Sequence, residues 1–83
     1  MTITEPQSDH LAELVARVKI QRALAPPARR RAIRRKAGVS QDEVGAACGV
    51  SRATVSHWET GVSSPRGEYL RLYVAALDVM AGR

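Results

Sequence analysis

The chain has 83 residues, the size of one small domain, and carries a formal net charge of +5. Its single cysteine, Cys48, excludes an intrachain disulfide, and Cys48, His10 and His57 lack the spacing of metal ligands. The first ten residues do not resemble a signal peptide, and no apolar run approaches the roughly 20 residues that span a bilayer, so we expect a cytoplasmic protein without membrane contact.

The positive charge is concentrated in the middle of the chain. Residues 26–60 contain seven basic and three acidic side chains, whereas residues 1–25 contain three of each. A basic segment of this kind is expected of a surface that binds a polyanion. The same run of arginines also suits a solvated helix face, so charge alone does not decide between the two.

The N-terminal part is predicted to form a flexible tail over residues 1–8 and a helix over residues 9–25. Apolar residues recur in this helix at helical spacing, at Leu11, Leu14, Val15 and Val18. The helix is expected to end before Pro26-Pro27, because the residue before a proline is disfavoured in the helical conformation.

Residues 27–83 are predicted to form a second unit with four helices. Pro27 suits the first turn of a helix that ends near Ala37. The sequence from Ser40 to Glu43 is a capping box, which begins a short helix that ends near residue 47 or 48. A fourth helix is expected over residues 52–60 and a fifth over roughly 66–80. The predicted fold class is therefore all-α with five helices, in which an N-terminal helix is added to a compact domain.

Residues 41–60 are predicted to form a helix-turn-helix motif. Gly49 supplies the sharp turn, and Ser51 caps the second helix of the motif. Small apolar residues are expected to pack between the two helices, namely Val44, Ala47 and Cys48 against Val50, Val55 and Trp58. The outward surface of the second helix is polar and free of acidic residues, and it consists of Ser51, Arg52, Ala53, Thr54, Ser56, His57 and Thr60. Such a surface suits the major groove of DNA, which is about 12 Å wide.

The last helix is apolar on two faces. The first face, with Leu70, Tyr73, Val74 and Leu77, is expected to cover the motif. The second face carries Tyr69, Leu72, Ala76, Val79 and Met80. A helix that is apolar all round needs cover on both sides, and the stripe at residues 11–18 is the expected partner, from the same subunit or from a second copy. We therefore expect a homodimer on DNA through the 9–25 and 66–80 helices.

Over about residues 27–78 the sequence resembles the phage repressor and Cro-type, or XRE-type, helix-turn-helix family. The resemblance rests on the spaced motifs GVSQ, GVS and VSHWETG and on the proline that follows them. Its rich use of arginine and alanine resembles that of actinobacterial and actinophage members. The resemblance implies a transcriptional regulator that binds a double-stranded DNA operator, with no enzymatic activity, no cofactor and no small-molecule ligand.

The resemblance also implies roles for individual residues. Base-contacting positions are Arg52, Ala53, Thr54, Ser56 and His57. Positions that contact the DNA backbone are Gln41, Ser51, Thr60, Ser63, Ser64 and Arg66, with Arg29, Arg30 and Arg31 preceding the motif. Arg34 and Glu59 match a buried ion pair that ties the first helix of the family domain to the recognition helix.

Two other classes of function, a protein-binding module and an enzyme, are the alternatives to DNA binding. Antitoxins and other protein-binding modules share this fold, and here the N-terminal helix is the surface that such a partner would use. Because no long tail follows Arg83, we do not expect a separate C-terminal segment for binding a toxin. An enzyme is not expected, because the sequence shows no nucleophile–base pair, carboxylate dyad, phosphate loop or metal set.

Overall fold

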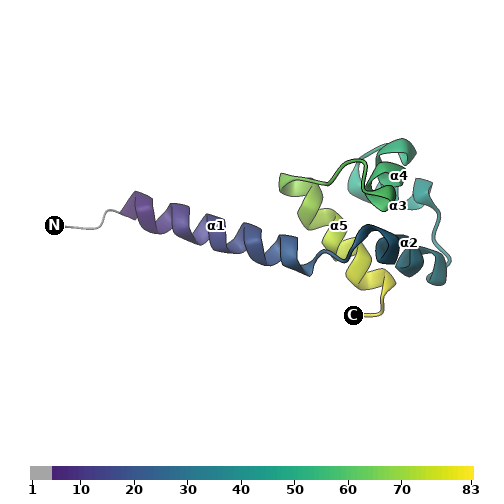
Figure 1. Cartoon of the computed structure of the whole chain (residues 1–83), viewed down its shortest axis with the longest axis horizontal. Helices are drawn as coiled ribbons and strands as arrows, with labels where there is room; N and C mark the ends of the chain where they lie inside the picture. The colour runs from purple at the N-terminus through teal and green to yellow at the C-terminus, as the bar shows by residue number, and fades with distance from the viewer. Residues whose placement is uncertain (1–4) are drawn as a thin grey trace.

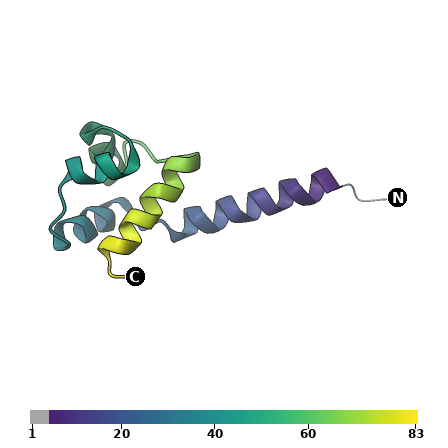
Figure 2. The ribbon, with the colours of Figure 1, turned by 180° about the vertical axis from the view of Figure 1, so that it is seen from behind.

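The computed structural model describes residues 5–83, and these residues form five α-helices and no strand. The helices are α1 (Glu5–Ala23), α2 (Pro27–Lys36), α3 (Gln41–Cys48), α4 (Arg52–Thr60) and α5 (Gly67–Met80). Helices α2 to α5 pack into a compact body, and α1 projects from it as a rod, as Figures 1 and 2 show from opposite sides. The predicted all-α class with five helices is confirmed. No described helix is long and apolar enough to cross a membrane.

Helices α2 to α4 begin at the predicted local signals. Pro27 occupies the first turn of α2. The Ser40 hydroxyl accepts a hydrogen bond from the Glu43 amide at 3.0 Å, and the Glu43 carboxylate accepts one from the Ser40 amide at 2.9 Å. The Ser51 hydroxyl accepts a hydrogen bond from the Thr54 amide at 3.1 Å. These bonds satisfy backbone donors that the first turn of a helix leaves free, so they fix where α3 and α4 start.

Helix α1 begins at Glu5, earlier than the expected residue 9. The flexible tail expected over residues 1–8 therefore overlaps α1 at residues 5–8, and residues 1–4 lie outside the described part of the chain.

The hydrophobic core lies where α3, α4 and α5 meet. It consists of Val44, Cys48, Val55, Trp58, Tyr73 and Leu77. The rings of Trp58 and Tyr73 pack with their centroids 4.6 Å apart at a tilt of 46°, a geometry that aromatic pairs favour. Leu70 and Val74 are also buried, so the first predicted face of the last helix is confirmed. With no phenylalanine in the chain, this aromatic pair supplies the two largest side chains of the core.

The turn between α3 and α4 depends on two glycines. Gly49 has a φ of +77°, which only glycine adopts readily, and this confirms its predicted role. Gly45 lies inside α3, and a Cβ there would be 2.6 Å from the backbone oxygen of Val50. The expected contact of Ala47 with α4 is wrong, because Ala47 is exposed and Gly45 faces the crossing instead. The two helices approach closely because Gly45 has no side chain.

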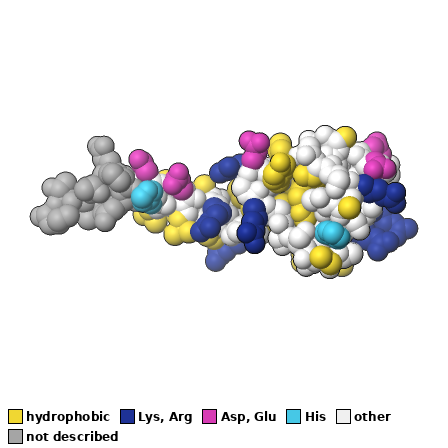
Figure 3. All heavy atoms as spheres, turned by 90° about the horizontal axis from the view of Figure 1, so that it is seen from above, with side chains coloured by type: hydrophobic (Ala, Val, Ile, Leu, Met, Phe, Trp, Pro, Cys, Tyr) yellow, Lys and Arg dark blue, Asp and Glu magenta, His cyan; other side chains and the backbone are white. Residues whose placement is uncertain are grey.

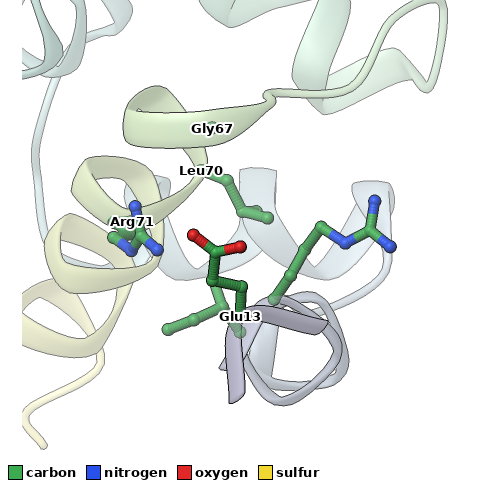
Figure 4. Close-up of a pocket in the computed structure, with 6 residues that line it drawn as sticks. Glu13, Gly67, Leu70 and Arg71 are labelled. Atoms are coloured by element: carbon green, nitrogen blue, oxygen red, sulfur yellow. The ribbon is translucent and has the colours of Figure 1, made fainter. Parts of the chain in front are cut away.

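Helix α1 contacts the body through a face that the sequence did not single out. A shallow pocket between α1 and α5 is lined by Glu13, Arg17, Ile20, Gly67, Leu70 and Arg71, and Figure 4 shows Glu13 below Leu70 in this pocket. Three residues of the stripe on α1 are exposed, with 61% of Leu11, 45% of Leu14 and 42% of Val15 accessible, and Val18 is half-buried. Tyr69, Leu72 and Val79 on the second face of α5 are exposed too. Of the two alternatives for the stripe, cover by the second face of α5 within one subunit is therefore wrong, and cover by a second copy stays a prediction.

The crossing at Gly45 yields a test in which two effects have opposite signs. Helix propensity alone predicts that Gly45→Ala stabilises α3 by roughly 0.5–1 kcal/mol. We expect instead that Gly45→Ala lowers the free energy of unfolding by about 1–3 kcal/mol, because the new methyl group overlaps the rigid backbone of the turn. Urea denaturation followed by circular dichroism measures the difference. The reverse change at the exposed neighbour, Ala46→Gly, is the control for propensity, and a stabilised Gly45→Ala variant would contradict the steric argument.

Candidate nucleic-acid interface

The outward face of α4 is open to solvent. Ser51, Arg52, Ala53, His57 and Thr60 are exposed, whereas Thr54 and Ser56 are half-buried. The one carboxylate of this helix, Glu59, is 5% exposed and lies inside the body. The surface that α4 presents is therefore polar and carries no negative charge, and no part of the described chain covers it.

A buried ion pair joins α2 to α4. The guanidinium of Arg34 donates from Nε to one carboxylate oxygen of Glu59 and from an Nη to the other, the latter at 3.0 Å. This two-pronged arrangement is the strongest geometry for an Arg–carboxylate pair. Arg34 also donates to the backbone oxygen of Val39 at 2.9 Å, which holds the loop before α3. The family resemblance implied this pair, and the two side chains do meet in the structure.

Glu59 remains ionised in its buried position. Burial opposes the charge and raises the pKa of the carboxyl, but the hydrogen bonds donated by Arg34 and Gln41 and the positive charges of Arg34 and Arg31 outweigh burial, so the pKa is lowered. The same hydrogen bond raises the pKa of the Arg34 guanidinium. The pair therefore stays charged over the whole neutral range.

Gln41 links this ion pair to the exposed surface of α4. Its side-chain amide donates to Glu59 at 3.1 Å, and its amide oxygen faces Nε of Arg52 at 3.5 Å, which is a long contact. The two terminal nitrogens of Arg52 make no hydrogen bond or ion pair with the described residues, so they are free to bind a ligand. Gln41 thus positions Arg52 from one side and is itself positioned from the other.

The three arginines expected to flank DNA are separated by the structure. Arg30 is only 7% exposed, and its guanidinium donates to the backbone oxygens of Trp58, at 2.9 Å, and of Ala25. It therefore joins α2 to the end of α4, and its assignment as a DNA-backbone contact is wrong. The spacing could have predicted the burial of Arg30, because residues four apart share one face of a helix and Arg34 was already expected to be buried.

Arg29 and Arg31 lie on opposite sides of α2. Arg31 lines a polar hollow with Arg34, Ser40, Gln41, Asp42 and Arg52. Arg29 lines a different hollow, with Ile33, Lys36 and Met80, at the C-terminal end of α5. Residues two apart on a helix point about 200° away from each other, which explains the separation. Of the three expected arginines, only Arg31 is beside the exposed face of α4. Figure 3 shows basic side chains gathered at the end of the body that lies farthest from the free end of α1.

The remaining expected backbone contacts differ in how free their polar groups are. Ser63, Ser64 and Arg66 are exposed in the segment between α4 and α5. The Thr60 hydroxyl already donates back to the backbone oxygens of Ser56 and His57, at 3.1 and 3.3 Å. Ser51 uses its hydroxyl oxygen to cap α4. The hydroxyls of Ser51 and Thr60 therefore bond within α4 in the free protein. The side chains of Ser63, Ser64 and Arg66 make no hydrogen bond with the described residues.

Sequence reasoning missed three features of this site: the burial of Arg30, the closeness of Gly45 to the turn, and the bond from Gln41 to Glu59. Among the described residues, no cluster of three or more His, Cys, Asp or Glu side chains could hold a metal ion.

Comparison with known families agrees with this geometry. A family model described as helix-turn-helix matches residues 31–79, which is more than half of the chain. No curated protein and no solved structure matches the chain. The matched segment begins within α2 and ends within α5, so it contains the ion pair, the turn and the whole of α4, and it leaves out α1.

The lowered pKa of Glu59 predicts a loss of stability in acid. A carboxyl whose pKa is lower in the folded state contributes stability above its unfolded value of about 4.3, and this contribution is lost as the pH falls through the folded-state pKa. We expect Glu59→Gln to lower the free energy of unfolding by about 3–5 kcal/mol at pH 7, because Arg34 is left buried and unpaired. The variant should also lose stability less steeply than the native chain below pH 4.

Chemical denaturation between pH 3 and pH 7 measures both effects. Glu68→Gln removes an exposed carboxylate of α5 and is the control, with an expected change at pH 7 of no more than about 1 kcal/mol. Equal acid sensitivity in the native chain and in Glu59→Gln would contradict the assigned role of Glu59.

The separation of Arg29 and Arg31 predicts different effects on salt-dependent DNA binding. We expect Arg31→Ala to weaken binding to any duplex and to reduce the slope of log K against log salt by about one for each bound chain, because one phosphate contact is lost. Arg29→Ala removes the same charge from the other side of α2 and should leave that slope unchanged. Fluorescence anisotropy titrations at several salt concentrations compare the two, and equal slopes would contradict the placement.

Proposed function

The chain belongs to the XRE-type helix-turn-helix family of DNA-binding regulators, and from this we propose that it is a Cro- or repressor-like protein of a phage or prophage that inserts α4 into the major groove of an operator. The observation that carries the proposal is the open, acid-free face of α4 with Arg52 at its N-terminal end. A regulator of this kind represses by occupying the operator, which excludes polymerase.

Base recognition is assigned to the exposed residues of α4. Arg52 extends a free guanidinium fork, which matches the two acceptors of guanine in the major groove. Ala53 is small and exposed, and the half-buried Thr54 carries a methyl group, so both suit contact with a thymine methyl. Ser56 and His57 complete the surface that faces the bases.

Contacts to the sugar-phosphate backbone are assigned to the groups around α4. Gln41 and Arg31 lie on one side of it, in the hollow that also contains Arg52. Ser63, Ser64 and Arg66 lie in the segment that follows it. Contacts on both sides of a recognition helix fix its register in the groove, and they carry no sequence information themselves.

The proposed form on DNA is a homodimer that uses α1 and α5. One α4 spans only a few base pairs, and a two-fold dimer places a second α4 one helical turn, about 34 Å, along the same face of the duplex. The exposed apolar residues of α1 and of the second face of α5 support this assembly.

The operator and the role of Arg52 are tested together. Selection of bound fragments from a random duplex pool should yield a consensus with two-fold symmetry. On that consensus we expect Arg52→Ala to bind about 5- to 150-fold more weakly for each bound chain, which corresponds to the 1–3 kcal/mol of one bidentate Arg–guanine contact. On an unrelated duplex the loss should be smaller, because only phosphate contacts remain.

Arg71→Ala is the matched control, since Arg71 is an exposed arginine on α5 beside α1 and away from α4. It should bind both duplexes as the native chain does. An equal loss on all sequences for Arg52→Ala would reassign Arg52 to the phosphates. Failure of the pool to enrich any sequence, together with capture of a stoichiometric protein partner, would favour the antitoxin or protein-binding alternative.

A further inference from the structure

We propose that α1 is a self-association helix, in which the stripe formed by Leu11, Leu14, Val15 and Val18 (the α1 stripe) packs antiparallel against the same stripe of a second copy. The proposal narrows the dimer interface of the proposed function from α1 and α5 to α1 alone, and it rests on the proposed homodimer to that extent. Its evidence is the position of the stripe, its symmetry and the charge beside it.

The α1 stripe points away from the body to which α1 belongs. The face of α1 that lies toward α5 carries Glu13, Arg17 and Ile20. At about 100° per residue, the centre of the stripe lies on the far side of the helix from these three residues. Large apolar side chains therefore project into solvent, and Leu11 is 61% exposed. No part of the described chain folds back over them.

The stripe is complementary to itself when two copies run in opposite directions. If Leu14 of one copy lies opposite Val15 of the other, Leu11 falls opposite Val18 in the same register. Every member of the stripe then meets an apolar partner, and a two-fold axis passes between residues 14 and 15. An interface with two-fold symmetry requires this kind of self-complementarity, because the same patch serves both subunits.

The charge beside the stripe favours the antiparallel direction over the parallel one. Lys19 lines the same hollow of α1 as Leu11 and Val15, whereas Glu13 and Arg17 lie on the face toward α5. Parallel pairing would bring the two Lys19 side chains together, whereas antiparallel pairing separates them along the helix axis. Two packed helices are 8–10 Å apart, about one Debye length at physiological salt, so the difference is felt.

A groove between α3 and α5 is the competing site for the stripe. It is lined mainly by apolar side chains, among them Leu72, Val79 and Met80, and Glu43 lies on its edge. The groove lies on the side of α5 opposite to α1, and it does not show the mirror pattern of the stripe. We therefore assign the second copy of α1 as the partner, and the groove is tested as the alternative.

The first experiment measures molar mass without DNA, so that its outcome is independent of operator binding. Sedimentation equilibrium of the native chain should give twice the monomer mass of 9.0 kDa at tens to hundreds of micromolar. Leu14→Glu should shift the population to monomer and retain the native circular dichroism spectrum, because Leu14 is 45% exposed and outside the core. Leu72→Glu, at a leucine that is 39% exposed in the groove, is the matched control and should remain a dimer.

The second experiment determines the direction of pairing by disulfide formation. Native Cys48 is buried, so the native chain under oxidant is the background. In the antiparallel register, Leu14→Cys lies within about 2 Å of its counterpart along the helix axis and should cross-link to itself. Leu11→Cys lies about 10 Å from its counterpart and should not, but it should link to Val18→Cys when the two variants are mixed.

Three results would overturn the proposal. These are a native chain that stays monomeric at hundreds of micromolar, dissociation of the dimer by Leu72→Glu, and self-linking of Leu11→Cys together with Leu14→Cys, which indicates parallel helices. Leu14→Glu should still bind the selected duplex with the same base preference, although more weakly. A native chain that stays monomeric and still selects a consensus duplex would contradict this inference and leave the proposed operator binding intact. A native chain that dimerises and selects no consensus would contradict the proposed function alone.

Discussion

The ion pair between Arg34 and Glu59 meets two needs of the fold at once. It joins α2 to α4 across the body, and it holds the only carboxylate of α4 away from the surface. An exposed glutamate on this helix would repel the phosphates of DNA at short range. The same carboxylate also binds Gln41, which contacts Arg52. Stability and the chemistry of the exposed face therefore depend on one buried charge and cannot be varied independently.

Local sequence signals predicted the helix boundaries well because the atoms that fix them are neighbours in the chain. Ser40 and Glu43 form the capping box, Ser51 caps α4, and Gly49 adopts a left-handed conformation. Each of these needs information from only a few residues. The start of α1, at Glu5 and not at residue 9, was less well predicted.

Side-chain placement across helices was harder to predict, since it depends on how each helix is rotated in the body. The basic run of α2 looked like one surface in the sequence, yet it divides into a buried Arg30, a paired Arg34 and two arginines on opposite sides. The count of charges predicted a basic surface correctly, but it did not predict which arginines lie on that surface. Gly45 was missed for the same reason, because its neighbour Val50 comes close only after the turn has formed.

The sequence left two partners open for the apolar stripe of α1, the same subunit or a second copy, and the structure excludes the first. Helix α1 packs on α5 through Ile20 and its neighbours, and the link to α2 is a short segment that ends in Pro26-Pro27. Two prolines restrict the backbone at this point, and the contact with α5 holds α1 at a defined angle to the body. Two recognition helices of a dimer bind two half-sites together only if the distance between the helices is fixed. If α1 forms the dimer, this proline link and the α1–α5 contact set that spacing. Because α4 lies away from α1, pairing leaves the reading surface open (Figure 1).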